Sequence, residues 1–504
     1  MKLPDDRLPE RLYSAASVRE MDRASIQDHN LPGYLLMTRA AEACVQALYQ
    51  HWPQPARAAI ICGGGNNGGD GYVLARLLIE RGVAVEALWL LPPERLKGDA
   101  AMALRDAVAA DVPVRPFSTE RLARCDLIVD ALLGTGLERP VEGEFLSAIR
   151  AINAARAAGA GVLAIDLPSG LAADTGCVLG EAAVIADATV SFIGLKAGLV
   201  TGAGPAHAGT LHFADLGAPA AVIAAAPVKA LRYSAADRGA LLGPRARTAH
   251  KGDFGHVLVI GGDAGMGGAV KLCSEAALRS GAGLVSCATH PGHASHLLSG
   301  RPEIMFRSVG SAEALASMLG RASVLAVGPG LGRSEWGRGL WKAALATSLP
   351  LVLDADGLNL LADAPSRRDH WVLTPHPAEA ARLLGCSTAE VQSNRFASAE
   401  APAERFGGVA VLKGAGSVIA SARPEDGVPV VIAAGNPGMA SGGMGDVLTG
   451  IIAALLAQGL TAFDAARLGA WLHAKAADLA VQAGGERGLI AGDLFIPLRR
   501  LVNP

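Results

Sequence analysis

Short apolar runs alternate with longer polar-faced segments along the first half of the chain. The runs stand at 58–62, 83–91, 127–133, 161–167 and 190–192, and the segments between them are rich in Ala, Arg and Leu. Short apolar runs bounded by turn residues predict buried strands, and the longer segments predict helices. Strands that alternate with helices favour an α/β fold, with a mostly parallel sheet covered by helices on both faces.

The same alternation returns in the second half of the chain. Its runs stand at 256–262, 277–289, 324–330, 349–357, 370–376, 408–414 and 429–434. Between the halves, residues 218–230 are rich in Ala and Pro and carry no charge before Lys229. We therefore predict a first domain at 1–220, a linker at 221–230 and a second domain at 231–504. No fixed-period repeat is visible, which argues against a solenoid.

Composition narrows the classes of protein that this chain can belong to. At 504 residues, with 51% hydrophobic and 18% charged residues, two globular domains are expected. A formal net charge of -2 gives no general attraction to nucleic acid or to an anionic membrane surface. Polar residues interrupt the apolar stretches before they reach spanning length, so we expect no transmembrane helix.

The N-terminus and the cysteines predict a cytoplasmic location. Residues 1–15 contain prolines and acidic residues where a secretory signal needs an apolar core. The seven cysteines are scattered without a CxxC pair, so neither a disulfide framework nor a zinc knuckle is indicated. A reducing compartment fits this pattern best.

The glycine-rich segment GGGNNGGDG, residues 63–71, follows the first predicted strand and precedes a predicted helix from Gly71 to Gly82. Such a loop allows backbone N–H groups to approach a phosphate closely, although a tight turn that needs glycine is the plain alternative. Asn66 and Asn67 stand in the middle of the loop, so the segment is not the G-x-G-x-x-G dinucleotide fingerprint. A conventional dehydrogenase is therefore disfavoured.

Polar residues end two further strands of the first half. Asp130 lies in LIVDALLGTGLERP, and Asp166 ends VLAIDLPSG. Open α/β sheets bind their ligands at the carboxyl ends of strands, whereas a lone Asp in such a place is more often a helix cap. Asn67, Asp130 and Ser169 together offer oxygen ligands for a hard cation, and Asp166 offers an acid or base.

Residues 15–220 resemble the NAD(P)H-hydrate epimerase family. Three motifs of that family occur here in the same order: NNGGDG, VDALLGTGL and DLPSGL. The resemblance implies a Rossmann-like domain in which Asn67, Asp130 and Ser169 bind K+ and Asp166 assists interconversion of the R and S hydrates. It also implies that the phosphates and ribose of the substrate are held by Asn66, Asn67, Gly68, Gly69, Asp70, Gly134, Thr135, Gly136, Leu137, Glu138, Arg139 and Pro140.

The second half carries a glycine-rich segment that runs straight into an apolar helix, NPGMASGGMGDVLTG at 436–450. The free N–H groups and the positive dipole end of such a helix stabilise a transferring phosphoryl group. Asp446 at the helix start can take the proton of an attacking hydroxyl, or it can be a plain N-cap. KGAGS at 413–417 offers a lysine and a hydroxyl to a phosphate, or forms a hairpin turn.

Residues 230–502 resemble the ADP-dependent NAD(P)H-hydrate dehydratase family. Besides the two segments above, the resemblance rests on HKGDFG, GPGLG, DADGLNLL and LTPHPAEAARLLG. The resemblance implies a ribokinase-like domain in which Asp446 is the base, and Ala269, Gly330 and His376 contact the hydrated dinucleotide. A structural histidine is the alternative for His376. The adenine nucleotide would be held by Lys413, Gly414, Ala415, Gly416, Ser417 and Gly445.

The implied reaction phosphorylates the C6 hydroxyl of NADHX or NADPHX, the hydrates of NADH and NADPH, at the expense of ADP. Elimination of phosphate then gives NAD(P)H, AMP and phosphate, and Mg²⁺ is expected because phosphoryl transfer builds charge. The loop GGDAGMGGA at 261–269 departs from the Ser and Tyr that family members often carry, which leaves its contacts open. The resemblance also suggests a homo-oligomer.

Two other functions remain open at the level of sequence. The second half could be a small-molecule kinase, because the ribokinase-like fold hosts many substrates. The first half could be a non-catalytic nucleotide-binding module. A kinase leaves a stable phosphorylated product, whereas a dehydratase releases phosphate and restores nicotinamide absorbance.

Overall fold

The computed structural model describes residues 8–234, 236, 238–293 and 300–503. The chain divides into two compact units, Met1–Leu231 and Arg232–Pro504. The segment expected to be a linker, 221–230, belongs to the first unit rather than standing free between the two. It contains most of helix α8 (Ala220–Ala225), whose Val222 is buried in the core of that unit. The Ala-rich composition of the segment thus supplies an apolar helix face.

The first unit is built on a seven-stranded sheet in which every pair of neighbouring strands is parallel. In spatial order the strands are β4 (Val114–Pro116), β3 (Ala84–Trp89), β2 (Arg57–Cys62), β5 (Leu127–Ala131), β6 (Gly161–Ile165), β7 (Ala188–Phe192) and β9 (Thr210–Ala214). The chain moves from β2 to β3 and β4 on one side and from β5 to β9 on the other. The strand order therefore reverses between β2 and β5, which is where open α/β sheets bind ligands.

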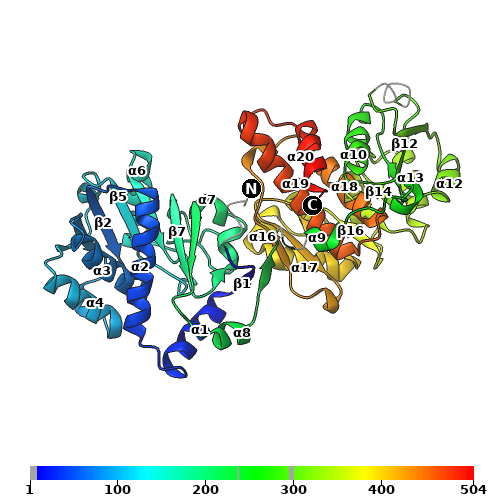
Figure 1. Ribbon diagram of the computed structural model, residues 1–504. Coiled ribbons are helices and arrows are strands. Elements are labelled where there is room, and N and C mark those ends of the chain that lie inside the picture. The colour runs from blue at the N-terminus through cyan, green and yellow to red at the C-terminus, as the bar shows by residue number, and fades with distance from the viewer. Residues whose placement is uncertain (1–7, 235, 237, 294–299, 504) are drawn as a thin grey trace. The chain divides into compact units, whose positions relative to one another are not determined.

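Helices cover both faces of this sheet, as Figure 1 shows. Ala58, Ile60 and Cys62 of β2 pack in one core cluster with α2 (Gly33–His51) and α3, while the alternate residues Ala59 and Ile61 pack in another with α6. This alternation is the period of a strand that is buried on both faces. The three-layer, Rossmann-like architecture predicted for the first half is confirmed.

The first unit also contains three short strands and several helices outside this sheet. Three short strands, β1, β8 and β10, pair with one another through β1, which is parallel to β8 and antiparallel to β10. The elements not yet bounded are β1 (Arg11–Tyr13), α1 (Ala15–Gln27), α3 (Asn66–Ile79), η2 (Pro93–Arg95), α4 (Gly98–Ala109), α5 (Thr119–Leu122), α6 (Gly143–Ala157), β8 (Leu195–Lys196), η3 (Ala197–Val200), α7 (Gly204–Ala208) and β10 (Ala230–Arg232).

Helix α3 begins at Asn66, five residues before the predicted start at Gly71. The segment NNGGD is therefore the first turn of a helix and not a free loop. Close packing explains its glycines, because a Cβ on Gly68 would lie 2.1 Å from the carbonyl oxygen of Gly63. The glycine at position 68 thus allows the helix to start directly against the end of β2.

The described residues of the second unit form nine strands. The first seven in spatial order are parallel to one another, and the eighth is antiparallel to both of its neighbours. In that order they are β13 (Met305–Ser308), β12 (Leu284–Thr289), β11 (His256–Ile260), β14 (Val324–Val327), β15 (Leu351–Leu353), β16 (Trp371–Leu373), β17 (Val409–Leu412), β18 (Ser417–Ser421) and β19 (Val430–Ile432). The run at 277–289 divides between the end of a helix and a strand, because Gly281 and Gly283 interrupt it. The run at 349–357 likewise contains a strand and the start of a helix.

The helices of the second unit complete its three layers. They are α9 (Arg238–Leu241), α10 (Gly267–Arg279), α12 (Ala312–Leu319), α13 (Glu335–Leu345), α14 (Ala355–Asp363), α15 (Pro377–Leu384), α16 (Thr388–Ser393), α17 (Arg395–Phe406), α18 (Met444–Ala457), α19 (Ala462–Gly484) and α20 (Phe495–Leu501), with short 3-10 turns η5 (Lys251–Phe254), η6 (Pro424–Asp426), η7 (Pro437–Met439) and η8 (Ala491–Leu494). Val257 and Val259 of β11 pack in the cluster of α10, α18 and α19, whereas Leu258 and Ile260 pack in the cluster of α12 to α15.

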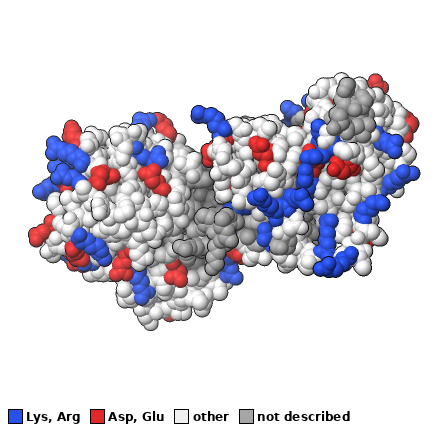
Figure 2. Space-filling view, turned by 45° about the horizontal axis from the view of Figure 1, so that its top comes forward, with Lys and Arg blue, Asp and Glu red and all other residues white. Residues whose placement is uncertain are grey.

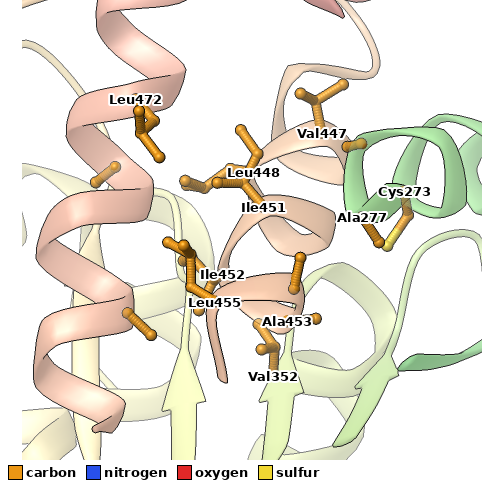
Figure 3. Packing of buried hydrophobic residues seen from close by; sticks show 14 of the residues in the cluster. Cys273, Ala277, Val352, Val447, Leu448, Ile451, Ile452, Ala453, Leu455 and Leu472 are labelled. Atoms are coloured by element: carbon orange, nitrogen blue, oxygen red, sulfur yellow. The ribbon is translucent and has the colours of Figure 1, made fainter. Parts of the chain in front are cut away.

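Helix α18 is buried between α10, α19 and the sheet, as Figure 3 shows for Val447, Leu448, Ile451 and Leu455. Gly450 allows α18 to approach α10 closely, because a Cβ there would lie 2.1 Å from the carbonyl oxygen of Cys273. A helix fixed on all sides holds its N-terminus rigidly, which matters for the site at that end.

Charged side chains lie mainly on the surface of both units, where Figure 2 shows basic and acidic groups interspersed over the first unit. Within the described residues, none of the helices combines the length and the apolar character needed to cross a lipid bilayer. All seven cysteines are free thiols.

Candidate functional site

The first unit contains a cavity of about 1220 Å³ at the carboxyl ends of β2, β5 and β6. It lies at the reversal of strand order, as expected for an open α/β sheet. Of the residues predicted to contact substrate, those that line the cavity are Asn66, Asn67, Asp70, Gly134, Thr135, Gly136, Leu137, Glu138, Arg139, Pro140 and Asp166. Gly68 and Gly69 are buried behind them and serve packing.

Asp166 occupies a strained backbone conformation directly after β6, with φ of 66°. A non-glycine residue in this region costs free energy and is a frequent feature of functional sites. Its Oδ1 accepts hydrogen bonds from the ammonium group of Lys196 and, at 3.4 Å, from the backbone N–H of Phe192. No helix begins at Asp166, so the capping alternative does not apply to it.

Asp130 and Ser169 lie together in the interior, where neither side chain is exposed to solvent by more than 1%. The Ser169 hydroxyl lies 2.6 Å from Asp130 Oδ1, and the Ser169 backbone N–H donates to Oδ2 at 2.7 Å. Burial raises the pKa of Asp130 to about 6, although the hydrogen bonds from Ser169 oppose the shift. These hydrogen bonds hold the carboxylate in place at the end of β5.

Asn67 lies at the cavity with both polar atoms of its side chain buried and without a hydrogen-bond partner. Buried amides are normally paired, so the unpaired amide of Asn67 is available to bind a ligand in the cavity. A Cβ placed on Gly134 would lie 3.6 Å from Asn67 Cγ and 3.6 Å from Asp166 Oδ2, which puts all three residues together. The amide, carboxylate and hydroxyl oxygens of Asn67, Asp130 and Ser169 are donors that suit a hard cation.

Three further carboxylates, Asp22 of α1, Asp70 of α3 and Asp99 of α4, line the same cavity. Burial, followed by the charge of Asp166, raises the pKa of Asp22, and the same two causes raise that of Asp70 well above its usual range. Lys196 opposes both shifts. Carboxyl groups therefore cluster at this end of the cavity, where burial and their mutual repulsion favour the neutral forms of Asp22 and Asp70 and the charge of Lys196 opposes this effect.

In the second unit, Asp446 is the third residue of α18, whose N-cap is Gly443. Asp446 is therefore not the N-cap, and its carboxylate accepts no hydrogen bond from the described residues. Burial, followed by the negative charge of Asp354, raises the pKa of Asp446 to about 7, while Lys413 opposes the shift. A partly buried carboxylate with such a pKa at a helix N-terminus is suited to accept a proton near neutral pH.

A buried ion pair lies beside Asp446. Lys413 Nζ lies 2.7 Å from Asp354 Oδ1, and Thr449 of α18 donates to Asp354 Oδ2 at 2.9 Å. Lys413 Nζ also lies 3.7 Å from Glu379. A Cβ on Gly445 would lie 3.3 Å from Lys413 Nζ, so this ammonium group sits at the start of α18. The Lys413 ammonium group and the positive end of the helix dipole thus both lie at the N-terminus of α18.

The segment KGAGS forms the turn between the antiparallel strands β17 and β18. It is thus a hairpin turn, which does not exclude contact with a nucleotide. The Ser417 hydroxyl and Gly414 are joined by hydrogen bonds within the turn. The buried guanidinium of Arg395 donates to the carbonyl oxygens of Leu412 and Lys413, both at 3.2 Å. These hydrogen bonds stabilise the turn.

His376 caps helix α15, since its Nδ1 accepts from the backbone N–H groups of Ala378 and Glu379. Its side chain is 51% exposed, so it is not the buried structural histidine considered from the sequence. Its Nε2 lies 3.3 Å from Glu379 Oε1. His376 therefore has a local structural role and a face open to solvent.

Gly330 and Ala269 lie together, because a Cβ on Gly330 would be 3.3 Å from Ala269 Cβ and 2.8 Å from Met266 Cβ. His293 supports the 261–269 loop, with Nε2 at 3.1 Å from the Gly265 nitrogen and 3.0 Å from the Asp263 oxygen. The structure thus brings together Ala269 and Gly330, two of the three residues that the resemblance assigned to the hydrated dinucleotide.

Lys196 and Asp354 are among the residues of these sites that had no role assigned from the sequence. Lys196 is the one charged residue in the run VSFIGLKAGLV at 190–200, and every residue of that run is buried. A single cation in an otherwise apolar buried run indicates an internal partner, which is the signal that could have found it. Asp354 lies in DADGLNLL, where its burial and its contacts with Lys413 and Thr449 distinguish it from Asp356.

Comparisons with known proteins match both units of the chain. A family model described as YjeF-related protein N-terminus matches residues 33–198, and one described as NAD(P)H-hydrate dehydratase matches residues 257–496. An ADP/ATP-dependent NAD(P)H-hydrate dehydratase from Bacillus subtilis, co-crystallised with ATP and Mg²⁺, is 30% identical and has a TM-score of 0.49; the match covers 54% of this chain and 96% of that one.

Two curated relatives match almost the whole chain, and both are called bifunctional NAD(P)H-hydrate repair enzyme Nnr. The relative from Coxiella burnetii is 48% identical over 98% of this chain and 99% of its own length. The relative from Escherichia coli is 44% identical over 99% of this chain and 95% of its own. Because both relatives match nearly the full length of the chain at this identity, the chain belongs to the family of bifunctional NAD(P)H-hydrate repair enzymes.

Proposed function

We propose that the first unit interconverts the R and S forms of NADHX and NADPHX, and that the second unit dehydrates the S form at the expense of ADP. The observation that carries this proposal is the pairing of two acid-base sites in one chain. One is Asp166 in a dinucleotide-sized cavity, and the other is Asp446 at the start of α18. The relatives that match the full chain bear names that agree with this combination.

In the first unit, Asp166 exchanges a proton with the C6 hydroxyl of the hydrated nicotinamide ring. Its Oδ2 accepts no hydrogen bond from the described residues and is therefore available. As the hydroxyl proton is removed, a C=O group forms at C6, and the bond between C6 and the ring nitrogen breaks with its electron pair passing to nitrogen. Addition of the nitrogen to the other face of the C=O group, with return of the proton to the oxygen, then inverts C6. The segments that begin α3 and that follow β5 bind the phosphates and ribose, so the reacting ring lies near Asp166 and Asn67.

K+ fits the oxygen atoms of Asn67, Asp130 and Ser169, because among the described residues the Asn67 amide has no hydrogen-bond partner and Asp130 has no cationic one. These three residues would hold the ion, which would supply positive charge to the bound substrate. We expect exchange of K+ for tetramethylammonium to slow R-hydrate conversion, since the larger ion cannot occupy the same position. Dehydration of pure S hydrate, measured in the same buffers, is the internal control. Equal conversion rates in both salts would contradict this assignment.

In the second unit, Asp446 takes the proton of the C6 hydroxyl while the hydroxyl oxygen attacks the terminal phosphoryl group of ADP. AMP leaves, and the N–H groups at the start of α18 and the Lys413 ammonium offset the charge on the transferring group. Phosphate then leaves C6 and a proton leaves the neighbouring carbon, which restores the ring double bond. Mg²⁺ supplies charge compensation for the phosphates, and Asp354, Glu379 and Asp446 are nearby carboxylates of the kind it binds.

The pH dependence of dehydration follows from Asp446, whose pKa is about 7. The base must be unprotonated, so we expect kcat/KM for the S hydrate to rise as pH increases through about 7 and to level off above it. Initial rates of absorbance recovery at saturating ADP, measured from mildly acidic to mildly alkaline pH, test this. A rate that is constant across this interval would show that Asp446 is not the titrating base.

The proposed function as a whole is tested with racemic hydrate, K+, Mg²⁺ and either ADP or ATP. Full return of reduced-nicotinamide absorbance with ADP supports both activities. Recovery that stops near half of the hydrate means that epimerisation fails. A stable phosphorylated product without absorbance recovery would identify the second unit as a small-molecule kinase.

Location and assembly remain predictions. We propose the cytoplasm, where reducing conditions suit seven free cysteines. We also propose a homo-oligomer, which light scattering of the purified chain would test.

A further inference from the structure

Lys196 is a buried cation in the wall of the first unit's cavity. It ends β8 and is only 1% exposed, and its neighbours Leu195, Ala197 and Leu199 are buried apolar residues. A charged ammonium group in such surroundings is costly unless it is paired and hydrogen-bonded. Its position is therefore explained by what its Nζ contacts.

Lys196 Nζ has three acceptors, which equals the number of its N–H donors. They are Asp166 Oδ1, the Phe192 carbonyl oxygen at 2.9 Å and the Ser191 hydroxyl at 3.3 Å. The Ser191 and Phe192 atoms anchor the ammonium group to β7, and the third donor holds Asp166. Because no N–H remains for a substrate, Lys196 acts on the reaction through Asp166.

The two carboxylate oxygens of Asp166 have different surroundings. Oδ1 accepts from Lys196 and from the Phe192 N–H, whereas Oδ2 has no partner among the described residues and lies near Gly134 in the cavity. The backbone of Asp166 is strained, so its side chain needs outside contacts to keep one orientation. Fixing Oδ1 directs Oδ2 toward the substrate.

Lys196 also balances the charges that face Asp166 from the surrounding elements. The ionisable side chains that line the cavity are Arg19 and Asp22 from α1, Asp70 from α3, Asp99 from α4, Glu138, Arg139 and Glu142 from the segment after β5, Asp166, and Lys196. Among these, Asp22 and Asp70 interact electrostatically with both Asp166 and Lys196. Without Lys196, a second or third negative charge would lie in a poorly solvated place.

We infer that Lys196 is the positioning residue of the epimerase site, which anchors Asp166 Oδ1 so that Oδ2 is the atom that exchanges the proton with the hydrate. This inference rests on the proposed epimerase activity and adds a residue and an atom to it. It also explains why a lysine stands in the apolar run at 190–200, a position that packing alone would assign to a hydrophobic residue.

The test uses the full-length chain with Lys196→Met, Lys196→Ala and Lys196→Arg, and Lys97→Met as the matched control at an exposed lysine of the same unit. R-hydrate conversion by Lys196→Met at neutral pH is expected to fall at least about tenfold, because a carboxylate among like charges is driven toward its neutral form. The pH profile of its R-hydrate conversion is expected to differ from that of the unmodified chain. Lys196→Arg keeps the charge and should retain more activity than Lys196→Met.

Chemical rescue separates positioning from a merely structural role. Methylammonium is expected to restore part of the R-hydrate conversion of Lys196→Ala, because the small cation fits the space left by the side chain, and to leave Lys97→Met unchanged. Dehydration of S hydrate shows that the second unit of each variant chain is folded and active. The near-UV circular dichroism spectrum shows whether the side chains of the variant are packed as in the unmodified chain.

A Lys196→Met enzyme with the wild-type rate and pH profile would overturn the inference. So would an equal loss at every pH in all three Lys196 variants without rescue by methylammonium, since that pattern indicates packing alone. Failure of the proposed function itself looks different, because the unmodified chain would then convert no R hydrate.

Discussion

Replacement of Asp446 by Asn is expected to slow ADP-dependent dehydration of the S hydrate by about 10²- to 10⁴-fold, the usual range for loss of a general base. Asn keeps the size of the side chain at the third residue of α18 but cannot accept the hydroxyl proton. The core around α18 is unchanged by this substitution, and interconversion of R and S hydrate in the first unit should continue. Initial rates with pure S hydrate, ADP and Mg²⁺ measure the effect.

The matched control for this variant is Asp464→Asn. Asp464 also lies in the first turn of a helix, α19, where it contacts Thr461 and Arg467 instead of facing a site. Its replacement tests the loss of an acidic residue near a helix N-terminus by itself. If Asp464→Asn were as slow as Asp446→Asn, the defect would come from helix stability and the assignment of a base would fail.

The Asp166→Asn chain is expected to lose R-hydrate conversion by about 10²- to 10⁴-fold while its dehydratase remains active. With racemic hydrate and ADP, absorbance should then return only to about half of the full value within the time that the unmodified chain needs for all of it. Asn tolerates a positive φ, so the strained backbone after β6 is preserved. Chiral chromatography of the remaining hydrate should show the R form.

Asp111→Asn is the control for Asp166→Asn, because Asp111 also has a positive φ, 61°, but lies in an exposed turn after α4. This variant should convert R hydrate at the normal rate. Full recovery of absorbance by Asp166→Asn at the normal rate would instead mean that another group moves the proton, and Asp70 in the same cavity would be the first to examine.

Much of the fold could be predicted from the sequence because strands and helices leave local patterns. Apolar runs located the central strands of both sheets, and their alternation with helices indicated three-layer units. The short strand β18 and the early start of α3 at Asn66 were missed. Both depend on partners far along the chain, since β18 pairs with β17 and β19, and α3 begins where Gly68 packs on Gly63.

The residues of the candidate sites, too, could be predicted only in part from the sequence. The glycine-rich segments and the polar residues at strand ends drew attention to Asn67, Asp166 and Asp446. Composition suggested a linker at 221–230, but Val222 is buried in the first unit, because an Ala-rich segment also forms an apolar helix face. Local sequence could not distinguish these two uses of the same residues.

The sequence by itself determined the strand and helix pattern, the two glycine-rich helix starts and the acidic residues beside them. Only the tertiary structure decided which groups meet: Lys196 with Asp166, 30 residues apart, and Lys413 with Asp354, 59 residues apart. The physical reason is that a parallel sheet brings the ends of distant strands to one edge, where charges pair across sequence separations that leave no local pattern.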